Sequence, residues 1–303
     1  MQFKTSLSDR ETGSTETGIV NLGGVDHFYQ WIRSPGSGTE KPITHKPVMV
    51  FVHGWGGSAR YWESTARAIC QDFDCLLYDL RGFARSVLPN TGVESLGSYE
   101  LGDYAQDLGL LLDHFGLERV YLNGHSLGAS IAALFAGQFP ERVERLILTC
   151  NGIFEYNALS FKAFHLIGGY VVKFRFPWFL SVPLAGRLFM ARFLHRPLPD
   201  AMSREFLEDY LMADEAAAVG TIYTAVSEQA ALEMPQIFAN LAIPTLLVSG
   251  EKDIIIPAQL GRNAAALNGR IEYLEIPQTA HFPMLEDAGA YLTGVRAFLQ
   301  SGI

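Results

Sequence analysis

The chain of 303 residues contains only three cysteines, Cys70, Cys75 and Cys150. Their spacing matches no metal-binding pattern, the eight histidines show no ligand spacing, and an odd number of thiols cannot all pair in disulfides. Each cysteine lies in or beside an apolar run, which is typical of a buried free thiol in a reducing compartment. We therefore expect a cytoplasmic protein that holds neither a disulfide framework nor a metal ion.

The sequence also lacks the segments that direct proteins into or across membranes. Residues 1–18 are polar and contain no apolar core of a signal peptide, and they predict a frayed terminus. No uninterrupted apolar stretch reaches the length that spans a bilayer. Because the net charge is −9, the surface as a whole is unsuited to binding nucleic acid.

Apolar residues make up 49% of the chain and charged residues 18%, a composition that permits a large core and argues against disorder. Short apolar runs, which predict strands, alternate with longer patterns that predict helices. The expected strands are 18–22, 28–33, 47–52, 75–78, 120–123, 143–150, 245–249 and 271–276. The expected helices are 61–70, 99–115, 127–138, 257–267 and 285–299.

This alternation stops between residues 151 and 242, where the pattern is helical and irregular. Apolar strands separated by helices predict an α/β fold with a mostly parallel, doubly wound sheet that is buried on both faces. We therefore expect one α/β core built from residues 1–150 and 243–303. Residues 151–242 are expected to form a helical cap inserted between two strands of that sheet.

A serine lies at the junction between an expected strand and an expected helix. Ser126 stands in the run Gly-His-Ser-Leu-Gly, directly after strand 120–123 and before helix 127–138. A sharp turn at such a junction exposes the serine oxygen, and flanking glycines let neighbouring segments pack closely. The motif arises by chance in many chains, so its strand–helix context carries the hypothesis that Ser126 is a nucleophile.

A serine nucleophile needs a base, and the base needs an acid that fixes its tautomer. Asp253 follows the buried strand 245–249 at the edge of the sheet where catalytic groups collect, with Glu251 as the alternative acid. A helix cap before Pro257 is the structural alternative for Asp253. His281 lies in the loop after the last strand, and its intrinsic pKa suits a general base.

When a serine oxygen attacks a carbonyl group, the carbonyl oxygen becomes negatively charged, and hydrogen-bond donors are needed to stabilise this oxyanion. The backbone N–H of Leu127, at the start of a helix, is one expected donor. The glycine-rich loop 53–57 supplies the other, for which Trp55 is the candidate. Trp55, His125 and Phe282 adjoin these positions and are the expected walls of the substrate pocket.

Four motifs follow one another along the chain: His-Gly-Trp-Gly-Gly at 53–57, Gly-His-Ser-Leu-Gly at 124–128, Gly-Glu-Lys-Asp at 250–253 and Ala-His-Phe at 280–282. Together they resemble the α/β-hydrolase superfamily, in particular its serine esterase and lipase-like branch with a helical cap. The resemblance covers the chain from about residue 18 and implies a Ser126–His281–Asp253 triad that needs no cofactor. Because residue 126 is serine, the haloalkane dehalogenases and epoxide hydrolases, which use aspartate, are disfavoured.

Residues 79–86, Asp-Leu-Arg-Gly-Phe-Ala-Arg-Ser, resemble a structural loop of the same superfamily. Ala84 stands where the family usually has glycine. We expect this difference to affect only the detailed turn of the loop.

The expected cap begins with a segment that contains no acidic residue. Between residues 156 and 199 there is no Asp or Glu, and aromatic side chains alternate with six basic ones: Lys162, Lys173, Arg175, Arg187, Arg192 and Arg196. Such a segment suits the headgroup region of an anionic bilayer. It also suits a lid whose apolar face covers the active site while its arginines reach water.

The sequence therefore predicts a hydrolase of hydrophobic carboxylic esters with a long acyl or prenyl chain, peripheral on a membrane. A phytyl ester of a chlorophyll-type pigment is a narrower hypothesis, by analogy with chlorophyll-dephytylating relatives of the superfamily. A carbon–carbon bond hydrolase or a cofactor-free peroxidase is the alternative, and a non-catalytic membrane-binding protein is a further one. The sequence leaves the oligomeric state open.

Overall fold

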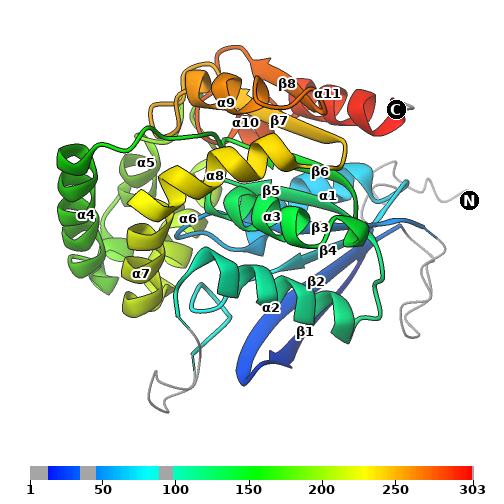
Figure 1. The fold of residues 1–303 in the computed structure, drawn as a ribbon. Helices are drawn as coiled ribbons and strands as arrows, with labels where there is room; N and C mark the ends of the chain where they lie inside the picture. The colour runs from blue at the N-terminus through cyan, green and yellow to red at the C-terminus, as the bar shows by residue number, and fades with distance from the viewer. Residues whose placement is uncertain (1–12, 35–45, 89–97, 302–303) are drawn as a thin grey trace, which may run out of the picture.

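The computed structural model describes residues 13–34, 46–88 and 98–301, and an eight-stranded sheet forms its centre (Figure 1). The order of the strands across the sheet is β1-β2-β4-β3-β5-β6-β7-β8. The β1–β2 and β2–β4 pairs are antiparallel, and the five remaining pairs are parallel. The strands are β1 Ser14–Leu22, β2 Val25–Arg33, β3 Val48–Val52, β4 Asp74–Tyr78, β5 Val120–His125, β6 Val143–Thr149, β7 Thr245–Gly250 and β8 Ile271–Ile276. The predicted mostly parallel sheet is confirmed.

Helices cover both faces of this sheet, which explains why every residue of β3, β4 and β7 is buried. Two separate apolar clusters result, one beneath α2 and α3 and the other beneath α1 and α11. The helices of the core are η2 Ala59–Trp62, α1 Glu63–Ile69, α2 Leu101–His114, α3 Leu127–Gln138, η4 Pro140–Arg142, α9 Ala258–Ala265, α10 Pro283–Glu286 and α11 Ala288–Gln300. The predicted helix 285–299 is wrong in one respect, because Asp287 ends α10 and caps α11 through the N–H of Ala290.

The expectation of a frayed terminus up to residue 18 is also wrong, because β1 begins at Ser14. Its polar first half pairs with β2 through the backbone, with Glu16 opposite Trp31. Main-chain hydrogen bonds do not require apolar side chains, so a polar segment can form this strand. An ion pair also holds the segment, since Glu16 Oε2 lies 2.9 Å from Arg33 Nη1. Residues 1–12 lie outside the described part of the chain.

The inserted helices separate β6 from β7, two strands that are neighbours in the sheet. They are α4 Ala158–Lys173, η5 Pro177–Ser181, α5 Ala185–Met190, α6 Asp200–Met212, α7 Glu215–Ala225 and α8 Glu228–Asn240. Figure 1 shows α4 to α7 gathered at one end of the sheet, while α8 leads back along α3. The Ser58 hydroxyl donates to Asp209 of α6 (2.6 Å), so the loop that follows β3 touches the cap.

The loop at 79–86 is organised around the buried carboxylate of Asp79. That carboxylate accepts hydrogen bonds from the Ala59 N–H (2.8 Å) and from the backbone and side chain of Arg85. Ala84 has φ +45°, in the left-handed region that favours glycine. The loop is thus held by its own hydrogen bonds, with alanine in a strained position.

The three cysteines are free and buried, as predicted from their apolar surroundings. Within the described residues, no helix is both long and apolar enough to cross a membrane.

Candidate active site

Ser126 lies at a strained turn between β5 and α3. Its φ is +54° and its ψ is −118°, values that a non-glycine residue rarely adopts. A Cβ at Gly124 would lie 2.5 Å from the Gly128 carbonyl oxygen, and one at Gly128 would lie 2.4 Å from the His53 carbonyl oxygen. Both glycines are therefore required by close backbone approach, which explains the motif around the serine.

The structure brings the three predicted catalytic residues together. The Ser126 Oγ lies 3.1 Å from His281 Nε2, and His281 Nδ1 lies 2.7 Å from Asp253 Oδ2. Asp253 is buried, and its Oδ1 accepts hydrogen bonds from the N–H groups of Ile255 (2.8 Å) and Ile256 (3.1 Å). The carboxylate thus accepts a hydrogen bond from Nδ1–H, so Nε2 is free to accept the serine proton.

Glu251, the alternative acid, does not reach His281 in the structure. Its carboxylate accepts from Lys252 Nζ (2.9 Å) and the Gln278 N–H (2.9 Å). The structural alternative for Asp253 also fails, since Pro257 precedes α9 and occupies the capping position.

The loop at 53–57 passes against the serine. A Cβ at Gly54 would lie 3.1 Å from the Ser126 Cβ. His53 holds the loop in place, because its Nδ1–H donates to the Gly54 carbonyl (2.8 Å) and its Nε2 accepts from the Leu80 N–H (2.8 Å). Burial lowers the pKa of His53, which favours this neutral form.

The backbone N–H groups of Leu127 and Trp55 are the two expected oxyanion donors. Leu127 is the first residue of α3, where the N–H groups of a helix have no partner within the helix. Across the part of the chain that the structure describes, no hydrogen bond joins the N–H of Leu127 or of Trp55 to another residue. The Trp55 indole is engaged elsewhere, since its Nε1 donates to the Ala218 carbonyl of α7 (2.9 Å).

Sequence reasoning missed a buried hydrogen-bond chain behind the serine. The Gly54 N–H donates to the Tyr61 hydroxyl (2.5 Å), which contacts His125 Nδ1 (2.9 Å), and His125 Nε2 contacts the His281 carbonyl oxygen (2.7 Å). A carbonyl can only accept, so His125 carries its proton on Nε2 and accepts from Tyr61 at Nδ1. Burial lowers the pKa of His125 well below its usual value and raises that of Tyr61.

These hydrogen bonds join the loop at 53–57, which carries Trp55, to the loop of His281. His125 was expected to line the pocket, but both its ring nitrogens are committed to protein partners, so neither is left for a substrate. Tyr61 carried no recognisable signal, because a tyrosine in a helix-like pattern is usually part of the core.

Glu286 was also missed, although its carboxylate connects the His281 loop to the cap. Its Oε1 accepts from the N–H groups of Ala280 (2.8 Å) and Phe282 (3.3 Å), and its Oε2 accepts from those of His195 (2.7 Å) and Arg196 (2.8 Å). Four backbone donors surround one buried carboxylate. Such a carboxylate fixes the positions of both segments.

The cap contributes directly to the surroundings of His281. The His281 N–H donates to the Phe193 carbonyl (2.9 Å), and the Phe193 ring lies 6.2 Å from the imidazole. Phe282, another expected pocket wall, is 7% exposed and packs on His125 and Phe206 at 4.7 and 4.8 Å. The His281 imidazole therefore has two aromatic rings beside it, those of Phe193 and Phe282.

The cap also contains a hollow of about 280 Å³ between η5, α5 and α6. Its lining residues run from Phe179 to Arg187 and include Asp200, Arg204 and Leu207. Ser126 and His281 are not among them, so the reacting groups do not line this hollow.

One group of described residues, His125, Cys150 and His281, is close enough to hold a metal ion, with its ligand atoms within 4.8 Å of one another. The ring nitrogens of both histidines are already hydrogen-bonded. Burial raises the pKa of the Cys150 thiol well above its usual value, whereas a metal requires the thiolate. This chemistry does not fit a metal ligand set.

Comparison with known proteins identifies the family of this chain. The chain is 29% identical over 268 residues to an uncharacterized protein of Mycobacterium tuberculosis (Rv2715), covering 84% of this chain and 76% of that protein. It is 28% identical over 237 residues to a putative carbamate hydrolase, RutD, of Pseudomonas savastanoi, covering 76% and 85%. A solved bromoperoxidase from Bacillus anthracis superposes with a TM-score of 0.76 at 18% identity, covering 95% and 100%. Residues 47–288 match the family model described as the alpha/beta hydrolase fold, and the chain therefore belongs to that family.

Proposed function

We propose that the protein hydrolyses carboxylic esters of hydrophobic substrates through an acyl-enzyme intermediate. The observation that carries the proposal is the continuous contact from Ser126 Oγ to His281 Nε2 and from His281 Nδ1 to Asp253. Burial of Asp253 and His281 strengthens the interaction between them, because little water competes for either group.

In the proposed reaction, His281 Nε2 removes the hydroxyl proton of Ser126 as Oγ attacks the ester carbonyl. The positive charge that develops on the imidazole is stabilised by the Asp253 carboxylate. The N–H groups of Leu127 and Trp55 receive the oxyanion, and the first of them benefits from its place at the start of α3. His281 then returns the proton to the leaving alcohol, and a water molecule releases the acid by the same steps.

The preference for a hydrophobic substrate is supported by the aromatic surroundings of the site. Phe193, Phe282 and Tyr61 contribute rings near His281 and His125. Apolar and aromatic walls with few polar groups are typical of sites that bind apolar ligands. The corresponding substrates are esters with a long acyl or prenyl chain, including the phytyl ester of a chlorophyll-type pigment.

A carbamate is the second candidate substrate, because a relative that covers 76% of this chain is named a putative carbamate hydrolase. The same serine and histidine would attack a carbamate carbonyl. The alternative activity predicted from the sequence is that of a carbon–carbon bond hydrolase or a cofactor-free peroxidase. The further alternative, a non-catalytic membrane-binding protein, requires that Ser126 be unreactive.

The test compares the wild-type protein with Ser126→Ala in two assays. A fluorophosphonate probe is expected to label the wild type and not the variant, and failure to label the wild type would overturn the proposed nucleophile. A series of p-nitrophenyl esters from acetate to palmitate is expected to show higher kcat/KM for the longer chains.

Faster cleavage of carbamates than of all esters would replace the proposed substrate class while keeping the nucleophile. Activity on carbon–carbon bonds or in a halide peroxidase assay, without ester cleavage, would favour the alternative. Release of free phytol from chlorophyll would identify the narrower substrate.

A further inference from the structure

Helix α4 exposes apolar side chains where a surface helix usually exposes polar ones. Its inward side is formed by Phe161, Gly168 and Val172, which are buried at helical spacing and face α7. The opposite side carries Leu166 (61% exposed) and Tyr170 (55% exposed). On an amphipathic helix at a protein surface in water, the outer side carries polar or charged side chains. The outer side of α4 is therefore suited to an apolar environment.

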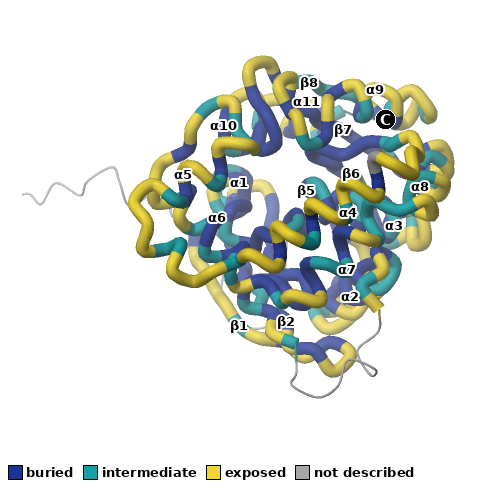
Figure 2. Tube along the Cα trace, turned by 90° about the vertical axis from the view of Figure 1, so that its left-hand side faces the viewer, coloured by how far each residue is buried: buried dark blue, intermediate teal, exposed yellow. Residues whose placement is uncertain are grey.

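The exposed apolar surface continues beyond α4 as a row of aromatic rings. The ring centroids are 6.1 Å apart from Tyr170 to Phe174, 6.1 Å from Phe174 to Phe176, and 6.2 Å from Phe176 to Trp178. These four side chains are 41–59% exposed. The row and the exposed apolar side chains of α4, η5 and α5 together form what we call the outer cap surface. Helices α4 and α5 belong to the end of the molecule that faces the viewer in Figure 2. A contiguous apolar surface of this kind marks a binding site.

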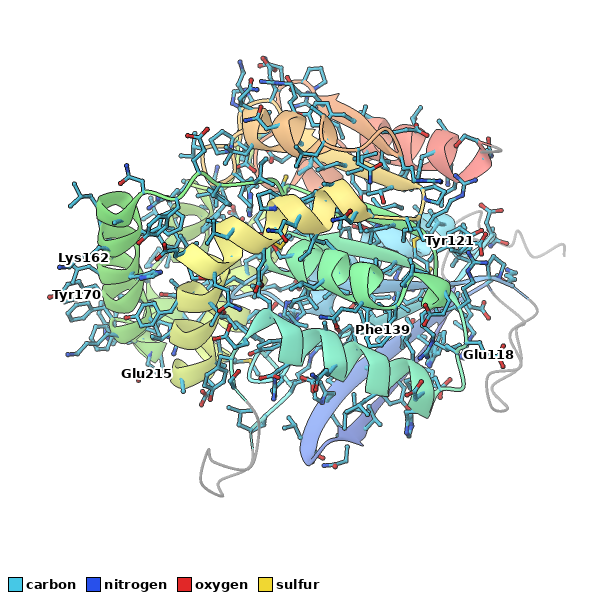
Figure 3. The ribbon with its side chains drawn as sticks, in the orientation of Figure 1. Glu118, Tyr121, Phe139, Lys162, Tyr170 and Glu215 are labelled. Atoms are coloured by element: carbon cyan, nitrogen blue, oxygen red, sulfur yellow. The ribbon has the colours of Figure 1, made fainter. Side chains whose placement is uncertain are left out.

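Positive charge borders the outer cap surface. Lys162 and Lys173 are exposed, and among the described residues no acidic side chain lies within 4 Å of either amine. Their separation of eleven positions is close to three helical turns, so both lie along one flank of α4. Figure 3 shows Lys162 and Tyr170 on the side of α4 that points away from the molecule. Residues 156–199 contain no acidic residue, although the whole chain carries a net charge of −9.

We propose that the outer cap surface binds the headgroup region of an anionic lipid bilayer, with α4 lying along the membrane. Lysines beside Phe, Leu and Trp are the composition of helices that lie in this region. Tyr and Trp favour it because each ring has an apolar body and a polar tip. Unpaired lysines are attracted to the negative headgroups. The inference goes beyond the proposed hydrolysis and does not depend on it.

The test measures flotation of the Ser126→Ala protein with vesicles, so that no turnover alters the lipid. Vesicles of phosphatidylcholine alone are compared with vesicles that also contain phosphatidylglycerol, at low and high salt. Binding is expected with phosphatidylglycerol and is expected to weaken at high salt. Absence of binding, or equal binding to both kinds of vesicle, overturns the proposal.

Two pairs of substitutions test the residues. Lys162→Gln with Lys173→Gln is expected to weaken binding about 25-fold, at about fivefold for each lysine. Phe174→Ser with Trp178→Ser is expected to weaken it about tenfold or more.

The matched charge control is Arg119→Gln with Arg270→Gln, which removes the same charge beside the amino ends of β5 and β8, away from the cap. The matched apolar control is Ile19→Ser with Leu110→Ser, two exposed side chains of β1 and α2. A loss in the controls equal to that in the cap variants would overturn the proposal. Thermal unfolding, measured for each variant, reports that the fold is intact.

A second copy of the chain is the competing occupant. Light scattering during size-exclusion chromatography measures the mass of the wild type and of the Phe174→Ser, Trp178→Ser variant. A dimer that is lost in this variant, together with absent vesicle binding, would assign the outer cap surface to self-association and overturn the proposal. Binding to vesicles without ester hydrolysis would refute the proposed activity alone.

Discussion

Replacement of Asp253 by asparagine tests the proposed triad by changing the tautomer of His281 while leaving the volume of the site unchanged. In the structure, Asp253 Oδ1 accepts from two backbone N–H groups and Oδ2 accepts from His281 Nδ1. The side-chain amide of asparagine has only one acceptor oxygen, whereas the carboxylate has two. The Asp253→Asn protein must therefore give up either the backbone donors of Ile255 and Ile256 or the histidine.

The backbone donors decide the orientation of that amide. Turning the NH₂ group toward Ile255 and Ile256 would leave two N–H groups unpaired, at about 1–3 kcal/mol each. The carbonyl oxygen is therefore expected to stay with them, so that the NH₂ group faces His281 Nδ1. Nδ1 must then accept, the proton moves to Nε2, and Nε2 can no longer take the proton of Ser126.

We expect kcat/KM to fall about 10⁴-fold, as this loss does in serine proteases. At about 1.36 kcal/mol for each factor of ten, the activation free energy rises by about 5.4 kcal/mol. The assay is hydrolysis of a p-nitrophenyl ester, with Ser126→Ala as the floor and thermal unfolding as the check on the fold. Glu251→Gln is the matched control, because it removes the neighbouring carboxylate that does not touch His281, and it is expected to keep wild-type activity. An Asp253→Asn protein within about tenfold of the wild type would refute the reasoning.

Three further changes have defined outcomes. Ala84→Gly relieves a left-handed backbone at φ +45°. It is expected to raise the free energy of unfolding, measured by urea titration, by about 0.5–1 kcal/mol, after the extra freedom of glycine in the unfolded chain is subtracted. A decrease in this free energy would contradict the strain at Ala84. Burial raises the pKa of Asp209 to about 6, above its unfolded value, so its contribution to stability is full below about pH 3.8 and is lost as pH rises through 6. The wild type should therefore gain about 2 kcal/mol of unfolding free energy over Asp209→Asn between pH 7 and pH 4. Stability curves of the two proteins that run parallel over this range would exclude the raised pKa of Asp209. Glu286→Gln turns an NH₂ group toward two of the four backbone donors. It is expected to lower the free energy of unfolding by about 2–4 kcal/mol and to lower kcat. An unchanged melting temperature would show that the carboxylate is not needed for stability.

Local sequence determined the elements that carry the predicted catalytic groups. The expected strand 120–123 and helix 127–138 predicted the turn at Ser126, and close packing at Gly124 and Gly128 leaves no room for side chains. The parallel sheet followed from buried apolar runs. The carboxyl ends of parallel strands share one edge, so residues that follow separate strands were expected to meet there.

Contacts between distant segments were decided only by the tertiary structure. Nothing near Tyr61 indicated that its hydroxyl would lie between Gly54 and His125, and nothing near Glu286 indicated four backbone donors. The choice between Asp253 and Glu251 also depended on three-dimensional distances. Composition predicted a basic aromatic segment at 156–199, but only the fold determined which of its side chains face outward. A sequence pattern reports the period of an element and its apolar side, whereas a hydrogen bond depends on where two separate elements place their atoms.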